Sequence, residues 1–173
     1  ESEAYALIAS SNQVIRDGHT LFFPSQKWIE KSRENGKFLP IQPYWDGEKL
    51  YLQKVYGSYE RLEEGAEIIS LNGANAQELI KDMLSKMMRE GYSYQYPVWV
   101  LNHYFYEYYS YFYGCSKSYT LELQSGGEIH SHEFDGLVKS DLLQKLTAEK
   151  GNHEKGISLK LDTENQWALL SIR

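Results

Sequence analysis

Apolar residues in the first part of the chain change their spacing several times, and each change marks an expected element. Residues 1–16 carry an interrupted apolar stripe at helical spacing and predict a helix. Asp17-Gly18 would end this helix, because glycine commonly follows a helix C-terminus. The apolar run at 21–23 predicts a short strand, and the polar stretch at 24–37 predicts irregular structure.

Strands are expected in the next part. Residues 38–45 and 49–56 are rich in β-branched and aromatic side chains, and Asp46-Gly47 between them is typical of a tight hairpin turn. Residues 67–71 predict a further strand.

A helix is predicted over 76–89, after a turn at Asn72-Gly73. Its apolar residues recur every three or four positions, and charged residues fill the other side. The apolar positions are Leu79, Ile80, Met83, Leu84, Met87 and Met88.

Residues 92–113 hold nine of the fifteen tyrosines of the chain. Pro97 suits a helix N-terminus and an apolar stripe follows it, so we predict a helix, although aromatic side chains also favour strands. Several adjacent surface aromatics form a patch of the kind that marks an interface. We therefore predict a protein-contact role for the tyrosines outside the stripe: Tyr104, Tyr106, Tyr111 and Tyr113.

The last part of the chain predicts two hairpins, a helix and a linker. The ranges are strands at 118–124 and 128–134 around Gly126-Gly127, a helix at 135–145, a polar linker at 147–156, and a hairpin of 157–161 with 166–172.

Composition narrows the class of partner. The 173 residues carry a net charge of -6 and no Lys/Arg-rich run, which argues against nucleic acid or an anionic membrane surface as a partner. No stretch reaches the roughly 20 apolar residues of a membrane span. The single cysteine excludes an internal disulfide and a cysteine-rich zinc site.

Nucleophilic catalysis needs a hydroxyl or thiol beside a base. The chain has no Gly-x-Ser-x-Gly or Ser-x-x-Lys motif. Ser25/Lys27 and Ser158/Lys160 are Ser-x-Lys pairs without a glycine turn that could form an oxyanion site. We predict no catalytic residue in this chain.

Two other groups of residues could carry chemistry, but a purely structural role explains each of them as well. Cys115 could pair with His103, but a small buried thiol is the commoner situation. His130 and His132 share one strand face without an evident third ligand, and an exposed polar face explains them equally well. We predict neither a metal nor another cofactor.

Two stretches carry a family resemblance: Arg-Asp-Gly-His-Thr at 16–20 and Gly-Ala-Glu-Ile-Ile-Ser-Leu-Asn-Gly at 65–73. In this order, with a helix before the first and a long helix after the second, they resemble the S41 family. These are the C-terminal processing, or tail-specific, serine peptidases, including tricorn-like members. The resemblance covers 16–173, and we expect structural roles for the motif residues Asp17, Gly18, His19, Thr20, Gly65, Asn72 and Gly73. His19 could cap the preceding helix through its ring.

The resemblance implies an α+β fold made of three parts. A short helical part at 1–37 would pack on a PDZ-like, partly open β-barrel with flanking helices at 38–147, and the tyrosine-rich insertion would lie at about 91–114. Residues 148–173 would be a linker and the first strands of a missing catalytic domain that holds the nucleophilic serine and the base lysine. The parent would be an exported bacterial serine endopeptidase, periplasmic or at the cell surface, of which we expect this chain to be a piece.

By the same resemblance, this piece would position a peptide or an unfolded protein segment, which would add as a strand beside 50–56 and against the 76–88 helix. The expected contacts are Leu50, Tyr51, Leu52, Gln53, Lys54, Val55, Tyr56, Leu79, Ile80 and Met83. Two alternatives remain open. The fold could be a ligand-free scaffold whose tyrosine-rich insertion meets the missing catalytic domain or a second subunit, or the exposed tyrosines could bind a glycan.

Overall fold

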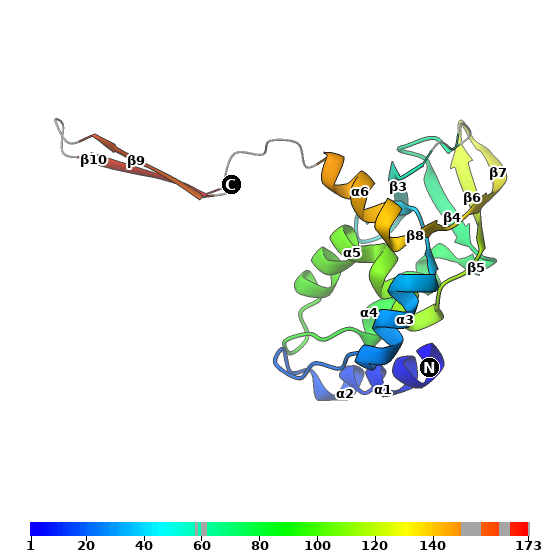
Figure 1. Ribbon diagram of the computed structural model, residues 1–173, viewed down its shortest axis with the longest axis horizontal. Helices are drawn as coiled ribbons and strands as arrows, with labels where there is room; N and C mark the ends of the chain where they lie inside the picture. Colours follow the sequence, from blue (N-terminus) through cyan, green and yellow to red (C-terminus); the bar gives the residue numbers. More distant parts are fainter. Residues whose placement is uncertain (58, 60–61, 150–156, 163–166, 173) are drawn as a thin grey trace. The chain divides into compact units, whose positions relative to one another are not determined.

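The computed structural model describes residues 1–57, 59, 62–149, 157–162 and 167–172 (Figure 1). The chain divides into two compact units, Glu1–Leu142 and Leu143–Arg173. Figure 1 shows the sheet at one side of the first unit, with the two N-terminal helices at its other end.

An antiparallel sheet organises the first unit, and its strands follow the order β2-β3-β4-β6-β7, with β5 beside β4. The described pairing does not close the sheet into a barrel, and helices accompany it, so the predicted α+β class is confirmed. A separate pair is formed by β1 and β8. The strands are β1 (Lys37–Phe38), β2 (Ile41–Trp45), β3 (Leu50–Val55), β4 (Glu67–Leu71), β5 (Ala74–Asn75), β6 (Ser118–Ser125), β7 (Glu128–Asp135) and β8 (Leu137–Val138).

Six helices are described, and four of them, α1, α2, α4 and α5, surround the cleft that is described below. The helices are α1 (Ser2–Ala9), α2 (Asn12–Ile15), α3 (Gln26–Asn35), α4 (Ala76–Lys86), α5 (Gln95–Tyr113) and α6 (Lys139–Glu149). Helix α1 packs against α5, and α2 packs against α4. The described backbone contains no helix long and apolar enough to cross a membrane.

The N-terminal segment differs from its prediction. The expected single helix is two helices, because Ser11 bonds back to Ile8 in a tight turn and the Ser10 hydroxyl donates to the Leu7 carbonyl. Arg16, with φ 52°, is the left-handed residue that ends α2, so the expected helix end at Asp17-Gly18 was wrong.

The segment that follows also corrects two expectations. Residues 21–23 form no strand, and the Tyr5 hydroxyl donates to the Phe22 carbonyl at 3.1 Å. The stretch predicted as irregular contains α3, where the Ser25 hydroxyl accepts a hydrogen bond from the Trp28 N–H at 3.3 Å. A serine cap thus starts a helix that lacks a strong apolar stripe.

The predicted tyrosine-rich helix is α5, and it bends at Tyr104 (φ -133°, ψ 30°). At the preceding residue, the His103 ring Nδ1 lies 2.7 Å from the Trp99 carbonyl oxygen, one turn back along the helix. A side chain that binds a helix carbonyl competes with the regular backbone ladder and favours a kink at this place.

The second unit contains the predicted terminal hairpin, formed by β9 (Ile157–Asp162) and β10 (Trp167–Ile172) in antiparallel register. Most of the polar linker expected at 147–156 lies outside the described residues.

Candidate functional site: an aromatic cleft beside the tyrosine-rich helix

The strand predicted to receive a peptide is an inner strand of the sheet. Strand β3 pairs with β2 along its length and with β4 at Tyr51. On the β4 side, the Leu52 N–H donates to the Ala66 carbonyl at 2.9 Å, and the Val55 N–H donates to the Glu64 carboxylate at 3.1 Å. The expectation that a peptide adds as a strand here was wrong, because both edges of β3 already have partners.

The helix side of the expected groove is also filled. Leu79, Ile80 and Met83 are buried in the hydrophobic core, so they cannot line an open pocket. Three β3 residues, Tyr51, Leu52 and Gln53, do line a wide, open hollow with Tyr44 and Gly65. The other contacts predicted on β3 and at Tyr56, directly after it, do not line that hollow: Leu50, Lys54, Val55 and Tyr56.

The four tyrosines predicted as an interface separate into two groups. Tyr106 and Tyr111 are buried, so their predicted surface role was wrong. Tyr106 packs edge-on against Phe38, and Tyr111 lies against Tyr5 and Trp28.

The other two tyrosines reach the surface. The Tyr113 hydroxyl donates to the Asp82 carboxylate, and the Lys86 ammonium lies 5.3 Å from the centre of its ring. Tyr104 is exposed and contacts Trp99 edge-on at a centroid distance of 6.0 Å.

An exposed aromatic surface lies on the first half of α5, and Tyr104 is the one of its residues that the sequence predicted. Tyr96 is 51 % exposed and Trp99 is 49 % exposed. Their rings stack at 6.3 Å, and His103 stacks on Trp99 at 4.6 Å. We call Tyr96, Trp99, His103 and Tyr104 the α5 aromatic surface. The spacing of three and four residues is the signal that could have identified it.

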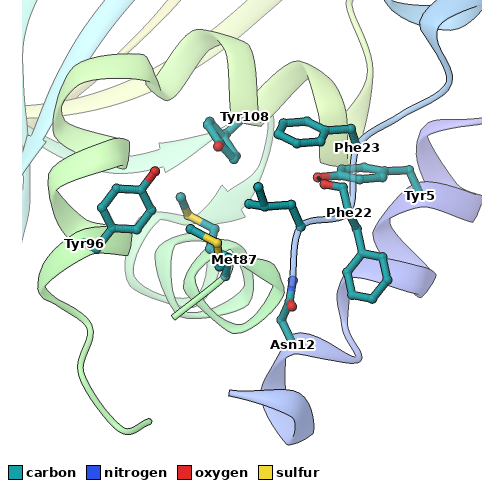
Figure 2. A pocket seen from close by; sticks show the side chains of 9 residues that line it. Tyr5, Asn12, Phe22, Phe23, Met87, Tyr96 and Tyr108 are labelled. Atoms are coloured by element: carbon teal, nitrogen blue, oxygen red, sulfur yellow. Dashed lines mark hydrogen bonds between the residues drawn. The ribbon is translucent and has the colours of Figure 1, made fainter. Parts of the chain in front are cut away.

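A narrow cleft adjoins this surface. Figure 2 shows Tyr96 and Tyr5 on opposite sides of the cleft, with Met87 between them. Its walls come from the N-terminal helices, the segment after α2, the residues after α4, and α5. The remaining lining residues are Asn12, Leu21, Phe22, Phe23, Met88 and Tyr108.

The polar side chains that line the cleft are those of Asn12 and three tyrosines, Tyr5, Tyr96 and Tyr108. Asn12 is 3 % exposed; its Nδ2 donates to the Lys86 carbonyl at 2.9 Å, and its Oδ1 has no partner among the described residues. Burial raises the pKa of Tyr108 to about 12 and raises that of Tyr5 as well, so both hydroxyls stay protonated donors at neutral pH.

The motif residues take structural positions. Asp17 accepts hydrogen bonds from the His19 N–H at 3.0 Å and from the Thr20 hydroxyl at 2.6 Å. The His19 side chain is 95 % exposed and makes no bond to a helix end, so the expected ring cap was wrong. The Gly18 N–H donates a hydrogen bond to the Glu90 carboxylate at 2.9 Å.

The second motif forms the expected turn. Gly65 and Gly73 both have positive φ, of 93° and 78°, which confirms the requirement at Gly73. The Asn72 Oδ1 accepts from the Thr120 N–H at 2.9 Å, and its Nδ2 donates to the Tyr109 hydroxyl at 3.1 Å. The turn is therefore tied to both β6 and α5.

Ser25, His103 and Cys115 are not among the residues that line the cleft. Ser25 caps α3, and Ser158 lies on β9 opposite Ser171. His103 belongs to the α5 aromatic surface, whereas burial raises the pKa of the Cys115 thiol to about 11. A reactive cysteine needs the opposite shift.

The two histidines considered as metal ligands, His130 and His132, lie on the edge strand β7. The His130 Nε2 lies 3.6 Å from a Glu128 carboxylate oxygen. His132 stands opposite Leu121 in the pairing of β7 with β6.

A scan against models of known protein families finds no match, and a search of curated proteins finds no matching sequence.

Proposed function

We propose that the chain is a non-catalytic, PDZ-like portion of a serine endopeptidase of the S41 type, and that its cleft and α5 aromatic surface bind a peptide or protein segment. One observation carries the binding part of this proposal: Tyr96 lines the cleft and also stacks on Trp99. An uncharged hollow beside exposed aromatic rings is a common form of site for an anchoring side chain. The family assignment rests on the two motifs.

The uncharged lining of the cleft favours contact with an apolar group. None of its described lining residues is charged, and Met87, Met88 and Phe22 offer apolar contact. Methionine side chains adapt to anchors of different shape, which suits a site that handles varied segments. Side-chain anchoring thereby takes the place of the strand addition that the paired edges of β3 prevent.

A peptide library with varied apolar residues tests the site. Binding is followed by tryptophan fluorescence and by peptide anisotropy, and compared between Tyr96→Ala and the matched control Tyr44→Ala. Tyr44 is 44 % exposed and lines the separate hollow at β3. We expect Tyr96→Ala to weaken binding about tenfold, which is the loss of one aromatic contact of about 1.4 kcal/mol.

The controls separate the alternatives. Weaker binding by Tyr44→Ala alone would move the site to the hollow at β3. If no peptide binds, the chain is a ligand-free scaffold. Incubation with casein and fluorogenic peptides tests the non-catalytic part: we expect no hydrolysis, and turnover abolished by Ser25→Ala would contradict it.

A further inference from the structure

Three potential metal ligands meet at a place that the proposed function does not use. Asp17 and His19 come from the turn after α2, and Glu90 comes from the segment between α4 and α5. One ligand atom of each residue lies within 4.8 Å of the others. The turn and Glu90 are far apart in sequence, so the tertiary fold brings this set together.

The one basic side chain in ion-pair range of the two carboxylates, among the described residues, is His19, whose Nδ1 lies 3.5 Å from Asp17 Oδ1. Among the described residues, neither Asp17 nor Glu90 forms an ion pair with a lysine or arginine. The two neighbouring arginines stack on tyrosines instead: Arg16 lies 4.4 Å from the centre of the Tyr92 ring, and Arg89 lies 4.5 Å from that of Tyr94. Two carboxylates held together without a cation repel one another, and a bound cation would relieve this repulsion.

The backbone is shaped to bring Glu90 to the turn. The Gly18 N–H donates to Glu90 Oε2 at 2.9 Å. A Cβ atom at Gly18 would lie only 2.7 Å from the same oxygen, so a larger residue would push the carboxylate away. The Gly91 N–H donates to the Arg16 carbonyl at 2.9 Å and holds the two segments side by side.

We infer that Asp17, His19 and Glu90 form a binding site for a divalent transition-metal ion of the zinc class. One imidazole and two carboxylates are a donor set that suits zinc, and three protein ligands leave a fourth position for water. The Thr20 hydroxyl and the His19 N–H orient the Asp17 carboxylate, as outer partners do in metal sites.

The metal would join the two segments that wall the aromatic cleft. Leu21 and Phe23 follow the Asp17–Thr20 turn, and Met87 and Met88 precede Glu90. Zinc would therefore fix the spacing of these walls from outside the cleft. This inference stands independently of what the cleft binds.

Calorimetric titration of the EDTA-treated, dialysed chain with zinc chloride tests the site. We expect one zinc ion per chain at this site, with binding weakened at least about tenfold in His19→Ala and Glu90→Gln. His19→Ala is a clean variant because the side chain is 95 % exposed. Gly18→Ala should weaken zinc binding too, because the added Cβ displaces the Glu90 carboxylate.

His130→Ala is the matched control, since His130 is also an exposed histidine beside a carboxylate, that of Glu128. It should leave zinc binding unchanged. Circular dichroism checks that each variant is folded. The inference is overturned if the chain takes up no zinc, if His19→Ala and Glu90→Gln bind zinc like the unmodified chain, or if His130→Ala removes the binding.

Discussion

Asn102 on α5 bonds both backbone polar groups of Trp45 on the edge strand β2. Its Oδ1 accepts from the Trp45 N–H at 2.8 Å, and its Nδ2 donates to the Trp45 carbonyl at 3.0 Å. The side-chain amide thus pairs with the end of β2 as a neighbouring strand would. A covered edge cannot recruit another strand.

Asn102→Ala is expected to lower the free energy of unfolding by about 1–3 kcal/mol, because two partly buried backbone groups lose their partner. Urea unfolding measures the loss. Asn35→Ala is the control: Asn35 is exposed and makes only one long bond, of 3.5 Å, so its effect should stay within about 0.5 kcal/mol. Equal losses in both variants would contradict the role of Asn102.

Gly73→Val is expected to lower the free energy of unfolding by about 1–3 kcal/mol, since valine avoids positive φ. No atom lies within 4 Å of a Cβ placed on Gly73, so the loss comes from the backbone and not from a clash. Ala74→Val is the control: it places a valine at the neighbouring exposed position, which has no positive φ. It should lower the free energy of unfolding by less than Gly73→Val does. An unchanged urea midpoint for Gly73→Val would contradict the turn.

Local signals made most of the sheet predictable. Asp46-Gly47 and Gly126-Gly127 supply tight turns between runs of strand-forming residues, and these determine the hairpins directly. The helix α3 was missed because its one clear signal is the Ser25 cap, while only two of its ten residues, Trp28 and Ile29, have large apolar side chains. The break between α1 and α2 depends on serine hydrogen bonds that a stripe of apolar residues does not reveal.

The candidate site was less predictable because it is built from distant segments. Tyr5, Phe22, Met87 and Tyr108 meet only after α1 packs on α5. Helical periodicity could have shown the α5 aromatic surface, but it could not show which tyrosines the N-terminal helices and β1 cover. Tyr106 and Tyr111 were misjudged for this reason.

The chain is expected to lose stability above about pH 10. Burial raises the pKa of many tyrosines above the ordinary value of 10.0, so the folded chain keeps protons that the unfolded chain releases. The protonated tyrosines contribute their full stabilisation below pH 10.0, the ordinary tyrosine pKa. This stabilisation is lost as the pH rises through the higher pKa values that the tyrosines have in the folded chain. These tyrosines are Tyr5, Tyr59, Tyr106, Tyr108, Tyr109, Tyr111, Tyr113 and Tyr119.

Urea midpoints at about pH 9 and about pH 11 check this expectation, with tyrosinate absorbance recorded in parallel. The midpoint should fall at the higher pH, and tyrosinate absorbance should rise steeply as the chain unfolds. Equal midpoints at the two pH values would show that the buried hydroxyls do not contribute as expected.

Cys115 is expected to react slowly with iodoacetamide at neutral pH. Burial raises the pKa of its thiol to about 11, and the nearby Lys139 charge offsets part of that rise. Because only the thiolate reacts, the rate should climb about tenfold per pH unit until the pH approaches that value. The same thiol in urea should react faster at neutral pH, since unfolding removes the burial.

Lys139→Met separates burial from charge in this pair. Removing the ammonium should raise the pKa of Cys115 further and slow alkylation at every pH below it, while the thiol stays covered. The variant also leaves Glu107 without its 3.1 Å partner, so circular dichroism must show that it is folded before rates are compared. Mass spectrometry of the alkylated chain gives the rates. Faster alkylation of the folded variant would mean that Lys139 shields the thiol sterically more than it favours the thiolate.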